Sequence, residues 1–282
     1  MTVPDRQRQS LPLNVRDQRF RDSAPSEKSG DPVARAWFIA LSCSFPRGEA
    51  MFIEGVKQNR DGAPPMLAAQ IRDFIKQEVN HSREHLAFNR RAVDAGYDLT
   101  TIDANVARTV NETLAKPPIV ILCVTVALEH FTAMFAKQFL QRPDLHADGM
   151  IGGPDLWLWH SVEEIEHKGV AYDTWLHATR DWSDWKRWSV RSLIMLSVTV
   201  RFLHHRSHDA RDILAQEGIT GWRAIGGKLR YLFVRPGMLR RIFPAWLDYF
   251  RPGFHPWDHD DHALLAQWEG RFGLAVPAEA TE

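Results

Sequence analysis

Apolar residues recur every three to four positions along most of the chain, a spacing that places them on one face of an α-helix. No stretch alternates regularly between apolar and polar residues, so no strand is predicted. Helices are expected at residues 33–59, 66–95, 102–114, 117–140 and 154–179. Pro46 and Gly48 should interrupt or redirect the first of these helices, and Gly96 should end the second.

The two ends of the chain differ from this helical middle. Residues 1–31 are polar and mixed in charge, with few core-forming side chains, and predict a flexible N-terminal arm. Residues 182–282 are rich in tryptophan and arginine and predict a C-terminal helical extension that packs on the rest. Residues 32–181 predict a four-helix bundle, so the expected fold class is all-α and ferritin-like.

The charge balance argues against one class of partner. The chain carries 35 basic and 35 acidic residues, so nothing predicts the broad phosphate attraction of a nucleic-acid-binding protein. Cys43 and Cys123 each lie in an apolar run, and two buried free thiols are favoured over a disulfide. There is no apolar leader, and no run reaches the roughly 20 apolar residues of a transmembrane helix. A cytoplasmic location is therefore expected.

Two of the predicted helices repeat the same pairing of a carboxylate with an imidazole. Glu78 and His81 are three residues apart, and so are Glu164 and His167, which places each pair on one helical face. His160 lies one turn before Glu164. Two such helices facing each other, with one further glutamate from each of two other helices, form the recurring arrangement of a dinuclear carboxylate metal site.

The other two helices of the bundle offer the further glutamates. Glu129 follows an uncharged run at residues 118–128 and precedes another apolar stretch. An isolated carboxylate in such surroundings is costly or takes up a proton, and a cation beside it removes that cost. Glu49 shares its helical face with apolar residues at i+3, i+4 and i+7, whereas Glu54 has more polar neighbours. Glu49 is therefore the candidate in the first helix.

The candidate metal ligands are four carboxylates and three histidines: Glu49, Glu78, His81, Glu129, His160, Glu164 and His167. Bridging carboxylates offset the repulsion between two dications, and neutral imidazoles complete each coordination shell without adding charge. These donors favour two iron ions, with manganese or zinc as alternatives. A structural polar network without metal is the simpler alternative, and His160 also suits a position behind a ligand.

Other polar residues near these motifs are given different roles. His85 is either a further ligand or, in the favoured interpretation, hydrogen-bonds to a ligating carboxylate. Glu163 and Glu166 are expected to be solvated or paired with arginine or lysine. His130 should pack in the core or at an interface. The run rich in histidine and aspartate at residues 255–262 predicts a solvated loop and a helix cap.

Four segments together resemble a bacterial family described as predicted metal-dependent hydrolases. They are FPRGE at 45–49, QEVNHSREH at 77–85, WHSVEEIEH at 159–167 and YFRPGFHPWD at 249–258. The resemblance extends from about residue 31 to residue 258 and implies a ferritin-like metal protein. The ligand order alone, Glu, Glu-x-x-His, Glu, His-x-x-x-Glu-x-x-His, is also similar to that of the di-iron arylamine N-oxygenases. That similarity implies iron at the same seven residues, but no substrate carries over.

The main functional hypothesis is a di-iron oxidoreductase. It would activate dioxygen to oxidise a small organic substrate and would take electrons from a donor. The first alternative is a metal-dependent hydrolase that uses a metal-activated water, and the second is a metal-binding bundle without catalysis. Residues 182–208 fit a core helix or the interface of a homodimer better than a membrane surface.

Overall fold

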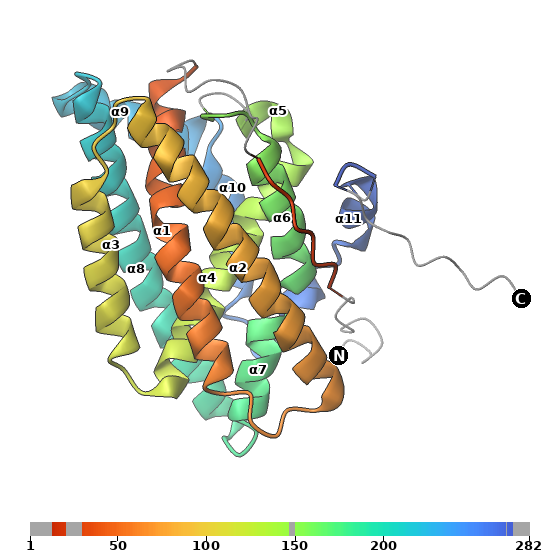
Figure 1. Ribbon diagram of the computed structural model, residues 1–282. Helices are drawn as coiled ribbons and strands as arrows, with labels where there is room; N and C mark the ends of the chain where they lie inside the picture. Colours follow the sequence, from red (N-terminus) through yellow and green to blue (C-terminus); the bar gives the residue numbers. More distant parts are fainter. Residues whose placement is uncertain (1–12, 21–29, 147–149, 269, 273–282) are drawn as a thin grey trace, which may run out of the picture.

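The computed structural model of the protein describes residues 13–20, 30–146, 150–268 and 270–272. Within these residues the regular secondary structure is helical and contains no strand, as the apolar spacing predicts. The all-α fold class is therefore confirmed. The long helices run side by side, and the shorter helices of the C-terminal extension lie behind and beside them (Figure 1).

The first long helix, α1 (Pro32–Lys57), starts at a local signal and passes through an internal proline. The Asp31 side chain accepts a hydrogen bond from the backbone N–H two residues later, and proline occupies the first helical position. The expected interruption at Pro46 is wrong, because α1 continues through it. Proline cannot donate to the Ser42 carbonyl, and the side-chain amide of Asn89 donates to that carbonyl instead, over 3.3 Å.

The bundle consists of α1, α2 (Pro65–Asp94), α4 (Pro118–Gln141), α6 (Asp155–His167) and α7 (Val170–Ala178). α1 packs against both α2 and α4, and α4 packs against α6 and α7. The helix expected at residues 154–179 is divided, because the chain turns at Lys168 and Gly169. In Figure 1, α7 continues below α6 and completes the fourth side of the bundle.

Close packing fixes the separation of the bundle helices. A Cβ atom added at Gly55 of α1 would lie 2.8 Å from the Thr125 Oγ1 of α4, so glycine allows the two helices to approach. The largest fully buried side chains are mostly aromatic and include Trp37, Phe38, Phe74, Phe88 and Trp159. Cys43 and Cys123 are buried free thiols, as predicted. This rigid core holds the candidate ligands of α1 and α4 at a defined distance.

Two further helices, α3 (Thr100–Leu114) and α8 (Asp184–Gln216), lie on the side of α1 away from α6 (Figure 1). α8 is attached to α1 by the buried Arg206. Its guanidinium donates to the Ala40 carbonyl over 2.5 Å and pairs with Asp209 at 2.7 Å. α8 therefore closes the bundle on the side where a cavity, described below, lies between the helices.

The remaining short elements are α5 (Pro143–His146), α9 (Gly221–Leu229), η2 (Arg230–Val234), α10 (Met238–Asp248), η3 (Pro256–Asp258) and α11 (His262–Trp268). α10 packs against α4: the Gln138 amide donates to the Met238 carbonyl over 2.9 Å, and His130 bonds to the Ala245 carbonyl over 3.2 Å. The extension thus contacts the bundle directly, while the division into parts at residues 31 and 181 stays a prediction.

α4 is the most apolar of the long helices. By length and composition it could cross a membrane, contrary to the expectation that no run is long and apolar enough. In the structure, however, 72% of its most apolar window is buried inside the fold, as in the core helix of a bundle. α4 therefore gives no argument for a membrane span, and the cytoplasmic location stays a prediction.

Candidate metal centre

The seven candidate ligands lie together inside the bundle. α1 supplies Glu49, α2 supplies Glu78 and His81, α4 supplies Glu129, and α6 supplies His160, Glu164 and His167. No one of these residues is more than 3% exposed. Spacings of three and four residues place the ligands of α2 and of α6 on inward faces, which is why two ligands or more can come from one helix.

One group of ligand atoms surrounds His167. Its Nε2 lies 3.2 Å from Glu78 Oε1, 3.5 Å from Glu129 Oε2 and 3.5 Å from Glu164 Oε2. Glu78, Glu164 and His167 offer ligand atoms that all lie within 4.8 Å of one another, which a single cation could bind at once. Glu129 thus reaches the cluster from the apolar helix in which the sequence places it.

A second group surrounds His160 and His81. The Nε2 of His160 lies 2.8 Å from Glu164 Oε1 and 3.8 Å from Glu49 Oε1. The Nδ1 of His81 lies 3.8 Å from both Glu78 Oε1 and Glu164 Oε1. Glu164 therefore directs one oxygen to each group, and Glu78 also approaches both. This is the placement of carboxylates that bridge two metal ions, and the cluster is compatible with a dinuclear site.

Many ligand atoms in this cluster have no hydrogen-bond partner. Both oxygens of Glu78 and Glu129 are unpaired, as are the Nδ1 of His81 and the Nε2 of His167. Buried polar atoms are normally paired, because an unpaired one costs free energy. A cation between these atoms would supply the missing partner, so the donor set fits a metal.

Burial controls the protonation of the cluster. Desolvation raises the pKa values of Glu49, Glu78 and Glu129 well above their usual range, and the neighbouring carboxylates raise them further. Desolvation also acts to raise the pKa of Glu164, but the charges of His167 and His160 and the hydrogen bond with His160 outweigh it and hold that pKa well below its usual range. Without a cation the cluster therefore retains protons on several glutamates.

An arginine from the N-terminal segment closes the cluster from outside. Residues 13–20 lie against α2 and α6 (Figure 1) and insert Arg16, which is 6% exposed. Its guanidinium pairs with Glu166 at 2.6 Å and with Glu163 at 3.2 Å. The expected pairing of Glu163 and Glu166 with arginine is thus confirmed, whereas the alternative that they are solvated is wrong because both are buried. Burial raises the pKa of Glu163 to about 8, although Arg16 acts to lower it.

These paired carboxylates fix the orientation of two ligand rings. The Nε2 of His81 hydrogen-bonds to Glu163 over 3.0 Å, which turns the Nδ1 of the ring toward the cluster. The Nδ1–H of His167 donates to the Gln77 side-chain oxygen over 3.0 Å, and the Gln77 amide donates to Glu166 over 3.2 Å. Such contacts to the far nitrogen are typical of histidines that bind metals. Arg16 thus organises both rings, and no motif in the polar segment around it indicates this role.

His160 is oriented by a separate chain of hydrogen bonds. Its Nδ1 lies 2.7 Å from the Nε2 of His85, and the Nδ1 of His85 lies 2.9 Å from Ser42 Oγ. The Ser42 hydroxyl donates to the Asn89 side-chain oxygen over 2.7 Å. His85 therefore lies behind a ligand, as expected, but it contacts an imidazole and not a ligating carboxylate. The chain directs the Nε2 of His160 to the cluster.

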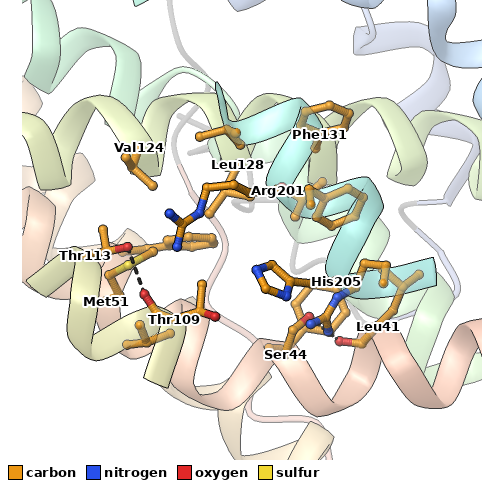
Figure 2. A pocket seen from close by; sticks show the side chains of 18 of the residues that line it. Leu41, Ser44, Met51, Thr109, Thr113, Val124, Leu128, Phe131, Arg201 and His205 are labelled. Atoms are coloured by element: carbon orange, nitrogen blue, oxygen red, sulfur yellow. Dashed lines mark hydrogen bonds between the residues drawn. The ribbon is translucent and has the colours of Figure 1, made fainter. Parts of the chain in front are cut away.

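A cavity of about 680 Å³ reaches the cluster at His160 and Glu164. Its walls are mainly apolar and include Phe52, Leu128, Phe131, Phe135 and Trp157. Figure 2 shows part of the lining, where Arg201 and His205 extend into the cavity from α8 and the threonines of α3 lie nearby. The cavity therefore offers an apolar path from the α3–α8 side of the bundle to the candidate metal ligands.

Other polar residues that the sequence raised lie outside the cluster. His130 packs against Tyr249 and Phe254, in agreement with a core role. His255 caps η3 and bonds to Asp173 over 2.9 Å, so the run at residues 255–262 forms a cap as expected, but the expectation of a solvated loop is wrong because His255, Trp257 and Asp261 are buried. Among the described residues, each group able to hold a metal is drawn from the seven candidates and His85.

The fold and the cluster define an all-α protein with a buried carboxylate–histidine site of the kind that binds metals. A model of the family described as "predicted metal-dependent hydrolase" matches residues 14–260, so the chain belongs to that family, as its motifs indicate. No curated protein and no solved structure matches the chain. The comparisons thus give no support to the oxidoreductase hypothesis, and they agree with the hydrolase alternative.

The metal-free protein should lose stability as the pH rises from 7 to 8.5. A raised carboxyl pKa stabilises the folded state fully below the unfolded value near 4.5, and this contribution is lost as the pH rises through the folded pKa. The lowered pKa of His81 has the opposite sign, but above about pH 7 its ring is neutral in both states. Calorimetric melting should therefore show a falling Tm without metal and a flatter profile with saturating metal.

The variant Glu129→Gln tests how much the Glu129 carboxyl contributes to this loss of stability and to metal binding. It removes one repelling carboxyl, so at pH 8 it should raise the Tm of the metal-free protein by ~2–4 °C and reduce the rise that metal produces. Glu54→Gln, at a carboxylate on the outer side of α1, is the matched control and should change neither quantity. Equal metal-induced shifts in Glu129→Gln and the unmodified protein would contradict a metal role for Glu129.

Arg16→Gln should weaken metal binding without touching a ligand. Removal of the guanidinium frees Glu163 and Glu166, so the rings of His81 and His167 lose their fixed orientation, and the affinity should fall by ~10–100-fold. Competition against a chromophoric chelator measures the change. Arg19→Gln alters an exposed arginine of the same segment and serves as the control. Unchanged affinity in Arg16→Gln would show that the N-terminal contact has no part in orienting the ligands.

Proposed function

We propose that the protein is a hydrolase with two metal ions, held by the seven candidate ligands, that cleaves an ester or amide of a substrate with an apolar body. One observation carries the proposal: unpaired buried carboxylates and oriented imidazoles meet at the end of an apolar cavity. The family to which the chain belongs supports the choice of hydrolysis.

The donors divide naturally between two metal positions. Glu129 and His167 would serve one position, while Glu49, His81 and His160 would serve the other. Glu78 and Glu164 approach both groups and would bridge them. Oxygen and imidazole donors suit zinc and manganese, the usual ions of hydrolytic sites, and also suit iron.

When bound, the metal ions would lower the pKa of a water molecule and polarise the carbonyl group under attack. The chain contributes orientation and exclusion of solvent. Glu163 and Gln77 direct the lone pairs of His81 and His167 inward. His160 and Glu164 line the cavity, so a carbonyl group in the cavity would meet the cluster there. The aromatic walls keep bulk water from the reacting bond.

The lining of the cavity sets the expected substrate class. The walls near the cluster are aromatic and aliphatic. Charged groups such as Arg201 and Lys116 are contributed by the outer helix α8 and by the turn between α3 and α4. An acyl chain would bury apolar surface along these walls, and about 0.8 kcal/mol is gained for each buried methylene group. The cavity-lining residues of α6, which carries His160 and Glu164, include no lysine or arginine. A phosphoester held there would therefore lack a basic side chain of α6 to bind its phosphate.

Zinc- or manganese-loaded protein should hydrolyse p-nitrophenyl esters, with kcat/KM rising from the acetate to the octanoate. Val124→Trp places a large ring in the cavity and should lower kcat/KM for the octanoate by ~10–100-fold, with the acetate little changed. Val93→Trp, at an exposed position on α2, is the matched control and should leave both rates unchanged.

The metal requirement is tested on the same esters. Glu164→Gln should lower kcat by on the order of 100-fold or more, because it changes a bridging ligand. Turnover that persists in a chelator or in Glu164→Gln would contradict the proposed site. A chain-length preference that survives Val124→Trp would instead contradict only the assignment of the cavity.

Oxygen activation is a second candidate, favoured by the combination of four carboxylates with three imidazoles beside an apolar cavity that dioxygen could enter. It predicts that iron-loaded protein, reduced without oxygen, consumes dioxygen when the two are mixed. An oxygen electrode and the visible spectrum measure this reaction. Rapid uptake by iron-loaded protein that hydrolyses none of the esters would favour this candidate over hydrolysis.

A further inference from the structure

α9 exposes its apolar face to solvent. Trp222 is 86% exposed, and Ile225 and Leu229 follow it at i+3 and i+7 with 41% and 54% exposure. These three residues form one helical stripe. In a helix that only packs on its own protein, such a stripe faces the core, but here the buried residue of α9 is Ala224.

The exposed apolar surface continues beyond α9. η2 adds Phe233 and Val234, and α10 adds Phe243 and Leu247, which are four residues apart. α10 lies against α8, because the Trp246 ring N–H donates to Thr199 Oγ1 over 2.9 Å. We define the outer face by the exposed apolar residues of α9, η2 and α10, which follow one another along the chain and pack in succession: Trp222, Ile225, Leu229, Phe233, Val234, Phe243 and Leu247.

The same segment carries a concentrated positive charge. Residues 218–247 contain six basic residues and no acidic one, although the whole chain has equal numbers of each. The basic residues are Arg223, Lys228, Arg230, Arg235, Arg240 and Arg241. Arg240 and Arg241 donate to the backbone carbonyls of Val234 and Pro236, which leaves their charges uncompensated by these contacts. Exposed aromatic rings and uncompensated arginines thus share α9, η2 and α10.

We propose that the outer face docks on the surface of an anionic lipid membrane. Tryptophan, phenylalanine and leucine would enter the headgroup boundary while the arginines contact anionic headgroups, the composition of a helix that lies in the membrane interface. A second copy of the chain fits less well, because two such faces would bring twelve positive charges together. The proposal departs from the sequence-based expectation for residues 182–208, which favoured a core helix or a homodimer interface over a membrane surface.

The proposal does not depend on the proposed enzymatic function. It adds one consequence, however, because α10 lies against α8 at Thr199, next to the cavity-lining residues Val198 and Arg201. Docking of the outer face would therefore bring the α8 end of the cavity close to the lipid, from which an apolar substrate could enter.

Sedimentation with sucrose-loaded vesicles tests the docking directly. The full-length protein should bind vesicles that contain 30% phosphatidylglycerol at least 10-fold more tightly than pure phosphatidylcholine vesicles, and 0.5 M salt should weaken the binding. Arg240→Glu combined with Arg241→Glu should reduce binding at least 10-fold, and so should Trp222→Ser combined with Leu229→Ser. All four positions are exposed, and circular dichroism verifies the fold of each variant.

The controls alter similar residues on another surface. Arg72→Glu combined with Arg90→Glu reverses two exposed charges on α2, and Leu86→Ser removes an exposed apolar side chain there; both should bind vesicles normally. Absent binding, equal binding to both vesicle types, or equal loss in the α2 controls would overturn the proposal. So would a concentration-dependent dimer that the outer-face variants abolish while the unmodified protein ignores vesicles.

Discussion

Four glutamates and three histidines share one dry interior, and their burial is the constraint on which the rest of the structure depends. Carboxylates removed from water need hydrogen bonds or cations, and an uncompensated buried charge costs several kcal/mol. Glu78 and Glu129 lack hydrogen-bond partners, and desolvation together with nearby carboxylates raises the pKa of both. Bound cations satisfy this arrangement, whereas protonation satisfies it only in part. The cations or protons that neutralise these carboxylates therefore also hold α1, α2, α4 and α6 together at their centre.

The contacts around the cluster serve the same constraint. Arg16 pairs with both Glu163 and Glu166, so each of these buried carboxyl groups has a partner outside the cluster. The hydrogen bonds that continue from them set the orientation of two imidazoles, and the chain through His85 sets the third. The ligands are thus preorganised for a metal before one binds, which lowers the cost of binding. The apolar cavity reaches the cluster at His160 and Glu164.

The sequence predicts the all-α fold and the ligand-bearing faces because both depend on local spacing. Helical periodicity follows from contacts three and four residues apart, and Glu129 stands out as the one acidic residue in an apolar helix. The continuity of α1 through Pro46 could not be predicted, because it depends on Asn89 of another helix. Arg16 could not be predicted either, since its partners are about 150 residues away and its own segment has no helical pattern. The outer face became visible only when the structure showed which apolar stripes remain exposed.

Anomalous diffraction from crystals of the metal-loaded protein, recorded on both sides of the absorption edge of the metal, tests the central claim most directly. The account predicts two peaks inside the bundle, each about 2.0–2.3 Å from its ligand atoms, with Glu78 and Glu164 between them and a histidine nitrogen on each. Maps without a peak at the cluster, in which the glutamates hydrogen-bond to one another, would contradict it. So would metal that is bound only elsewhere on the protein.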